Sequence, residues 1–232
     1  QRFTARAGLL EHPLQNPSYA SFIDRLEQLG IDVFDPAPLL VEHPDRPGEA
    51  RYLRADTHWL PPVVDEIARL LAMKIEGVES VSAGVAGMYR RREVVVEGLG
   101  DTAQMLVLPA DQTWIQPQRV SLQMVTDRAG KRWRSSREAE ILLLGDSFTN
   151  VFSDPALGWG ATAGLAEQLG FHLQRPVDRL AVNAGGALQA RLALRREMEG
   201  GEDRLQGKKV VIYQFATREL SQGDWRLVEF PR

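Results

Sequence analysis

Two short polar motifs carry the residue types of a serine-dependent active site. The segment "ARYLRADTHWLP" (residues 50–61) places Asp56 two residues before His58. The segment "LLLGDSFTN" (142–150) places Ser147 directly after an apolar run. In a Ser-His-Asp site the carboxylate orients the imidazole, and the imidazole takes the proton of the serine hydroxyl. We therefore take Asp56, His58 and Ser147 as candidate acid, base and nucleophile.

Each motif taken alone also has an ordinary structural interpretation. The Gly-Asp-Ser motif is as typical of a strand end with a turn and a serine helix cap as it is of a catalytic serine. Asp-Thr-His-Trp alone favours a surface turn before a helix. In an extended segment, residues two apart point the same way, so Asp56 and His58 can act as one unit. The combination of the two motifs is therefore more informative than either one.

The apolar run before Ser147 predicts a buried, parallel strand that delivers a polar loop at its carboxyl end, where open α/β sheets place their ligands. Apolar strands and amphipathic helices alternate after it, which predicts an α/β fold with a parallel sheet flanked by helices. The predicted strands are "IDVF" (31–34), "AEILLLG" (139–145), "DRLAVNAGG" (178–186) and "KKVVIYQFA" (208–216), and the predicted helices are 17–29, 63–75, 161–170 and 190–199.

The segment from about 85 to 134 has a different pattern of residues. Short runs rich in Val and Leu alternate with Gly, Asp and Pro, which predicts strands and turns. These runs are "REVVVEGL" (92–99), "MLVLP" (105–109) and "RVSLQMVTD" (119–127), and "DRAGKRW" (127–133) is typical of a hairpin turn. We predict one domain over 1–232 with a β-rich insertion at about 85–134, between the Asp-x-His and Gly-Asp-Ser motifs.

Composition excludes several classes of protein. A net charge of −3 predicts no general affinity for nucleic acid. The absence of Cys excludes disulfides and thiolate catalysis, but it fits either redox compartment. No His or Cys cluster has metal-ligand spacing, and there is no dinucleotide or Walker glycine pattern, so we expect no metal and no cofactor. His12, His43 and His172 have no polar partner nearby in the sequence, and we predict surface positions for them.

The two motifs together resemble SGNH (GDSL-like) hydrolases. Most of those enzymes carry Asp-x-x-His after the serine, whereas here Asp-x-His precedes it. That order, the short spacing and the intervening β-rich segment resemble the alginate O-acetyltransferase family of SGNH-like proteins. The resemblance covers roughly 18–225 and includes "GLGDTAQMLVLP" (98–109), "GWGATAGLAEQLG" (158–170) and "YQFATREL" (213–220).

The resemblance implies a triad of Asp56, His58 and Ser147. It also implies a periplasmic enzyme that moves acetyl groups onto an exopolysaccharide and is supplied by a membrane-bound acyltransferase. Ordinary SGNH enzymes complete the oxyanion hole with a glycine and with the asparagine of a Gly-x-Asn-Asp block, which is missing here. The segment "VNAGGAL" (182–188) offers Asn183, Gly185 or Gly186 instead, besides the backbone N–H of Ser147.

Two further residues are candidates for binding the substrate. Trp159 lies between two glycines after the serine segment, where it can either stack on a sugar ring or be buried in the core. Arg218 can bind substrate or brace the site through an ion pair with Glu219. Trp59, next to His58, is expected to pack in the core.

The leading hypothesis is an O-acetyltransferase that forms an acetyl-Ser147 intermediate and passes the acetyl group to a polysaccharide hydroxyl. One alternative is an SGNH-type acetylesterase, in which water replaces the sugar hydroxyl. Another is a non-catalytic polysaccharide-binding scaffold of a secretion complex. We expect the protein in the periplasm, in association with the inner membrane.

Overall fold

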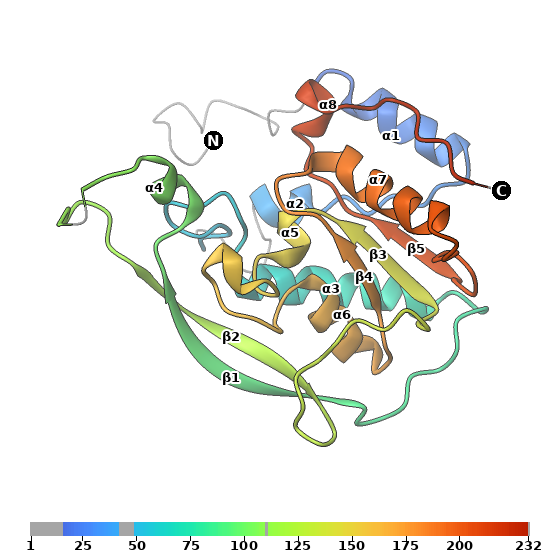
Figure 1. The fold of residues 1–232 in the computed structure, drawn as a ribbon, viewed down its shortest axis with the longest axis horizontal. Coiled ribbons are helices and arrows are strands. Elements are labelled where there is room, and N and C mark those ends of the chain that lie inside the picture. Colours follow the sequence, from blue (N-terminus) through green and yellow to red (C-terminus); the bar gives the residue numbers. More distant parts are fainter. Residues whose placement is uncertain (1–15, 42–48, 110, 232) are drawn as a thin grey trace. The chain divides into compact units, whose positions relative to one another are not determined.

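The computed structural model describes residues 16–41, 49–109 and 111–231 (Figure 1). The chain divides into two compact units. One unit comprises the described part of 1–49 together with 217–223, and the other comprises 50–216 with 224–232. The prediction that 1–232 form a single domain stays a prediction, and each unit is described by itself below.

The first unit is helical. Helix α1 (Tyr19–Gln28) confirms the helix predicted over 17–29, and α2 (Ala37–Val41) and α8 (Glu219–Gln222) belong to the same unit. The strand predicted at 31–34 is wrong, because these residues pair with no strand in the described part of the chain. Ile31 is 49% exposed, so the apolar pattern there does not mark a buried strand. The Asn16 side chain donates to Ser221 Oγ at 2.7 Å and ties the two segments of this unit together.

A three-stranded parallel sheet forms the centre of the second unit, with β3 (Ile141–Gly145) between β4 (Asp178–Ala181) and β5 (Val210–Tyr213). Every residue of β3 is buried, which explains its unbroken apolar run. Ala190 and Leu194 of α7 (Gly186–Glu199) pack on Leu142 and Leu144. Helices α3 (Pro61–Glu76) and α6 (Leu165–Leu173) pack against each other on the other side of the sheet (Figure 1). The predicted α/β fold with a parallel sheet and flanking helices is confirmed.

Strands β1 (Tyr89–Gly98) and β2 (Gln118–Asp127) form a separate antiparallel ribbon. Their register runs from Tyr89 opposite Asp127 to Gly98 opposite Gln118. The turn predicted at 127–133 is present, since Asp127 N–H donates to the Lys131 carbonyl at 2.8 Å. The "MLVLP" segment is not a strand, because Met105 is the last residue of α4 (Asp101–Met105). That the whole segment is an insertion stays a prediction.

A polar cluster joins this ribbon to helices α3 and α6. Asp65 of α3 forms an ion pair with Arg91 of β1, and it lies 2.6 Å from Nε2 of His172 on α6. Burial alone would raise the pKa of Asp65, but hydrogen bonds from His172 and Arg91 outweigh it and lower the pKa. The surface position predicted for His172 is wrong, since only 18% of its side chain is exposed. His12 and His43 lie outside the described residues.

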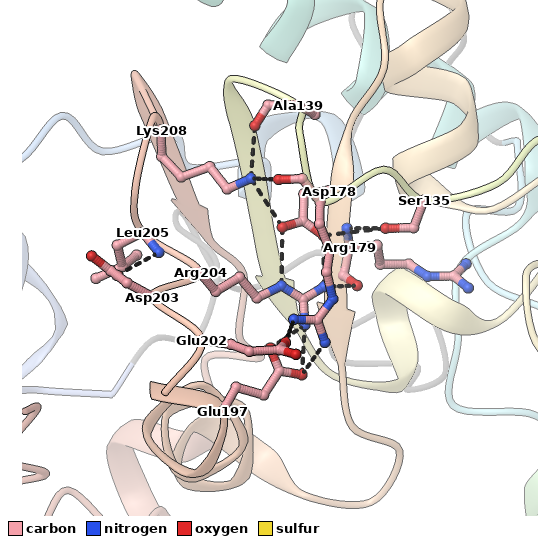
Figure 2. A network of polar contacts seen from close by, with 11 residues as sticks. Ser135, Ala139, Asp178, Arg179, Glu197, Glu202, Asp203, Arg204, Leu205 and Lys208 are labelled. Carbon is pink, nitrogen blue, oxygen red and sulfur yellow. Dashed lines mark hydrogen bonds and ion pairs between the residues drawn. The ribbon is translucent and has the colours of Figure 1, made fainter. Parts of the chain in front are cut away.

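A buried charge network holds the amino ends of the strands (Figure 2). Asp178, the first residue of β4, is fully buried and accepts from Arg204 Nε at 3.0 Å. Lys208 Nζ lies 3.1 Å from the same carboxylate, and Arg204 also donates to Glu197 of α7 at 2.8 Å. The network therefore ties β4, α7 and the segment leading into β5 at the end of the sheet opposite Ser147.

In the described ranges, no helix combines the length and the apolar character that crossing a bilayer requires.

Candidate active site

Asp56 and His58 lie in a tight loop rather than in an extended segment. Tyr52 and Trp59 pair as an isolated antiparallel bridge that closes the loop. Leu53 N–H donates to the His58 carbonyl at 3.0 Å across the closure. Ala55 has a φ of +50°, a conformation that residues with a Cβ rarely adopt. The two side chains therefore meet because the chain turns, and not because residues two apart share one side of a strand.

The Asp56 carboxylate accepts four hydrogen bonds. Its Oδ1 accepts from the His58 backbone N–H at 2.8 Å and lies 2.7 Å from His58 Nδ1. Its Oδ2 accepts from the Trp159 indole at 2.8 Å and from the Asp101 backbone N–H at 3.0 Å. Burial alone would raise the pKa of Asp56, but these bonds outweigh it and lower the pKa. An ionised Asp56 fixes the proton of neutral His58 on Nδ1 and leaves Nε2 as the basic atom.

Ser147 is the first residue of the short helix α5 (Ser147–Asn150), which follows β3 directly. The Asp146 carboxylate caps this helix by accepting from Phe148 N–H at 2.9 Å. Gly145 is required for the close turn, since a Cβ there would lie 2.1 Å from Thr149 Oγ1. The nucleophile turn, residues 145–149, thus places Ser147 at the carboxyl end of the central strand, as predicted.

Phe148 connects the Asp56–His58 loop to the nucleophile turn. The His58 and Phe148 ring centroids are 4.9 Å apart, and the Trp59 indole donates to the Phe148 carbonyl at 3.1 Å. Trp59 is buried, as predicted. His58 Nε2 is buried and has no hydrogen-bond partner among the described residues. The structure therefore brings the candidate base next to the residue that follows Ser147, with its basic nitrogen unoccupied.

Gln214 is a site residue that sequence reasoning missed. Its Oε1 accepts from Asp146 N–H at 3.2 Å and from Thr149 Oγ1 at 2.8 Å. Its backbone N–H donates to the Leu144 carbonyl at 2.8 Å. Gln214 follows β5, the neighbour of β3, so the parallel order of the strands was the signal that could have placed it beside the nucleophile turn.

The oxyanion candidates Asn183 and Gly186 lie on the connection from β4 to α7. Val182 N–H donates to the Gly145 carbonyl at 3.0 Å, so this connection runs beside the nucleophile turn. The Asn183 amide donates to Asp154 at 2.7 Å and accepts from Asn150 at 2.9 Å. Gly186 begins α7 with a φ of +52°. These contacts give Asn183 a role in holding the connection, and an oxyanion role for either residue stays a prediction.

The structure places Trp159 in the core. Its side chain is fully buried, and its ring lies so close to Gly98 that a Cβ there would be 2.8 Å away. The expectation that Trp159 stacks on a sugar ring is therefore corrected, and its indole N–H binds Asp56 instead. Arg218 belongs to the helical unit, where its Nε lies 3.9 Å from Oε1 of Glu219. Substrate binding by Arg218 stays a prediction.

Asp56, His58 and Asp101 also form a group whose possible metal-ligand atoms all lie within 4.8 Å of one another. Both Asp101 oxygens accept from Thr57, one from its backbone N–H at 2.8 Å and one from its hydroxyl. Both Asp56 oxygens likewise face N–H donors. Hydrogen bonds from Thr57, His58 and Trp159 therefore account for the carboxylate contacts of this group.

Comparison with known proteins gives the class to which this fold and site belong. The model of the SGNH hydrolase-like domain of acetyltransferase AlgX matches residues 6–217. The chain belongs to this family of SGNH hydrolase-like acetyltransferase domains. No curated protein sequence matches the chain.

Two solved structures share the fold. The O-acetyltransferase domain of Pseudomonas putida AlgJ is 19% identical, with a TM-score of 0.64, and the match covers 90% of this chain and 68% of that one. Pseudomonas aeruginosa AlgX is 21% identical, with a TM-score of 0.58, over 85% of this chain and 42% of that one. The chain thus spans less than half the length of the AlgX structure that it matches.

Proposed function

We propose that this chain is a serine-dependent O-acetyltransferase that acetylates hydroxyl groups of an alginate-type exopolysaccharide. The observation that carries the proposal is the Asp56–His58 pair, with an unoccupied Nε2 beside the turn that bears Ser147. Membership in a family of acetyltransferases supports the reaction class.

The reaction has two halves. Ser147 Oγ attacks the acetyl carbonyl while His58 Nε2 takes the hydroxyl proton, and the leaving group then departs with that proton. A sugar hydroxyl next attacks the acetyl carbonyl of acetyl-Ser147 and gives its proton to His58 Nε2. The bond between Ser147 Oγ and the acetyl group breaks, the sugar leaves as the acetyl ester, and the proton returns from His58 to Ser147 Oγ. Asp56 stays ionised throughout and stabilises the imidazolium. The Ser147 backbone N–H, with Asn183 or Gly186, donates to the oxyanion.

Transfer to sugar must compete with hydrolysis, because the same base activates water. Water is present at about 55 M, whereas well-oriented reactants reach effective molarities of about 10⁵ M or more. A bound sugar hydroxyl can therefore outcompete water by about a thousandfold. An acetylesterase would share the triad and differ only in lacking this acceptor site.

The test is single-turnover acetylation with 4-nitrophenyl acetate, with and without deacetylated alginate oligosaccharides. We expect an acetyl group on the Ser147 peptide by mass spectrometry, its loss to the glycan, and no acetylation of Ser147→Ala. Ser153→Ala is a control of equal exposure, 8% for both serines, and its folding is checked by circular dichroism because the Ser153 hydroxyl donates to the buried Glu167 at 2.6 Å. Wild-type turnover by a folded Ser147→Ala protein would refute the nucleophile, and free acetate as the sole product would favour the esterase.

We further propose that the protein works in the periplasm and that a membrane-bound acyltransferase delivers its acetyl groups. Both points rest on the family alone. Fractionation of the native host checks the first, and co-purification with a membrane acyltransferase after detergent extraction checks the second.

A further inference from the structure

Trp114 is the most exposed aromatic side chain among the described residues, with 84% of its surface exposed. The residues around it hold one another in a fixed shape. Gln112 Nε2 donates to the Ile115 carbonyl at 2.8 Å, and Ile115 N–H donates back to Gln112 Oε1 at 2.9 Å. Gln116 Nε2 also donates to the Thr113 carbonyl at 2.7 Å. Residues 111–118, here called the Trp114 loop, therefore have a braced backbone and present a large flat ring to solvent.

The Trp114 loop is joined to the candidate active site. Gln118 at its end accepts from the backbone N–H of Arg54 at 2.7 Å, and Arg54 lies in the loop that carries Asp56 and His58. The chain that precedes the Trp114 loop is anchored to the same place, since Asp101 at the start of α4 binds both Asp56 and Thr57. Both ends of the β1–β2 connection are thus fixed to the loop that bears the base.

The chemistry of the Trp114 loop suits a sugar chain. The C–H face of a pyranose ring packs on an indole, and Thr113 and the glutamine amides beside Trp114 match sugar hydroxyls. Arg54 and Arg119, at the base of the loop, are both exposed and can pair with the carboxylates of a uronic acid. In the described part of the chain, Arg119 pairs with Glu97 at 3.9 Å, which is a weak, solvated contact.

We infer that the Trp114 loop is the acceptor subsite: Trp114 stacks on a sugar ring of an anionic polysaccharide while Arg54 and Arg119 bind its carboxylates, on a connection whose two ends are hydrogen-bonded to the loop that bears His58. This inference rests on the proposed function for the chemistry of the polymer. It gives to Trp114 the stacking role that the buried Trp159 does not fill.

Binding of deacetylated alginate oligosaccharides to the whole chain tests the inference, measured by calorimetry and by tryptophan fluorescence. Trp59, Trp133 and Trp159 are buried and Trp225 is 38% exposed, so the glycan-dependent protection from acrylamide quenching that the wild type shows and Trp114→Ala lacks reports on Trp114. We expect Trp114→Ala to weaken binding about tenfold or more and to abolish the protection. Trp114→Phe should retain affinity to within about threefold, because the ring remains.

Two further variants sharpen the result. Leu227→Ala is matched in exposure, since Leu227 is 83% exposed, and should bind as the wild type does. Arg54→Gln should weaken binding at low salt and lose its difference from wild type at high salt. Unchanged affinity in Trp114→Ala, or equal losses in Trp114→Ala and Leu227→Ala, would overturn the inference and leave the exposed tryptophan as a contact for a protein or a membrane.

The outcomes for the two proposals are separable. If turnover of 4-nitrophenyl acetate depends on Ser147 but glycan binding does not depend on Trp114, the acceptor subsite alone is overturned. Trp114-dependent glycan binding without any acetylation of Ser147 overturns the proposed function and supports the subsite.

Discussion

Asp56 accepts hydrogen bonds on both oxygens from three other residues: His58, Asp101 and Trp159. One oxygen faces the imidazole, and the other is held by a backbone N–H and an indole. The carboxylate therefore cannot rotate without breaking bonds to two separate segments. Orientation of the base is thus a property of the surrounding loop as much as of the pair itself.

Trp159→Phe tests this bracing role. It removes one charge-assisted hydrogen bond, worth about 1.5–3 kcal/mol, while leaving most of the ring volume. We expect kcat to fall about tenfold or more with little change in KM. The pKa of Asp56 should rise, because its ionised form loses a donor, and an NMR titration of the Asp56 carboxyl measures this rise.

Trp133→Phe is the matched control for that experiment. Trp133 is also buried, but its indole nitrogen has no hydrogen-bond partner in the described structure. Its replacement should leave kcat and the pKa of Asp56 as they are. Equal effects of the two variants would mean that ring packing, and not the bond to Asp56, explains the loss.

Asp56 and His58 are expected to act as one unit with Ser147. The alanine variants of Asp56 and His58 should each lose most of the acetylation rate, by about 10³-fold or more, and the double variant should lose little beyond that. Single-turnover rates of all three proteins supply the comparison. Losses that multiply in the double variant would contradict a shared function.

At the scale of elements, the nucleophile turn depends on the absence of a side chain at Gly145. Gly145→Ala would set a Cβ 2.1 Å from Thr149 Oγ1 and 2.9 Å from Gln214 Oε1, so α5 must shift. A displacement of about 1 Å can cost about 100-fold in rate, and we expect a loss of that order in acetylation of Ser147.

Gly77→Ala is the control for this prediction. A Cβ at Gly77 meets only the Lys74 carbonyl, at 3.4 Å, which is ordinary contact, and its φ of −75° suits alanine. Circular dichroism should show both variants folded. Full activity in Gly145→Ala would mean that the turn tolerates the added atom.

The sequence predicted correctly those helices and strands whose pattern of apolar residues follows from their burial. The strand before Ser147 was found because every side chain in it is buried, and α3 because its apolar residues share one side. The strand predicted at 31–34 failed because four apolar-rich residues do not define a pairing partner. The triad candidates were found from residue types, but the turn that joins Asp56 to His58, the burial of Trp159 and the position of Gln214 depend on contacts between distant segments.

At the scale of the whole molecule, a buried ion-pair network surrounds Asp178 at the amino end of the sheet (Figure 2). Burial alone would raise the pKa of Asp178, but Arg204 and Lys208 outweigh it and lower the pKa. A carboxyl whose pKa is depressed on folding stabilises the protein above its unfolded pKa of about 3.9, and that stability is lost as pH falls through the folded pKa.

Asp178→Asn should therefore destabilise the protein strongly at pH 7. It removes the carboxylate that pairs with both Arg204 and Lys208 and leaves Arg204 with Glu197 as its carboxylate partner, and breaking a buried ion pair typically costs about 3–5 kcal/mol. Urea unfolding at pH 7 measures the loss, and the difference from wild type should shrink below about pH 4, where Asp178 takes up a proton in the unfolded wild type before it does so in the folded protein. Asp224→Asn, at an exposed ion pair, should change stability little. Equal stability of Asp178→Asn and wild type would show that the network around Asp178 makes no net contribution to the free energy of unfolding.

The hydrogen bonds that assemble the site join residues 89 and 103 positions apart in the chain. Contacts of such long range form late in folding, because the entropy of closing the intervening chain must be overcome first. During synthesis the acid and the base emerge well before the serine, and their mutual contact is local. On the proposed function, the nascent chain carries an inert Asp56–His58 half-site, and we expect the onset of esterolysis to report the late folding step that brings Ser147 beside it.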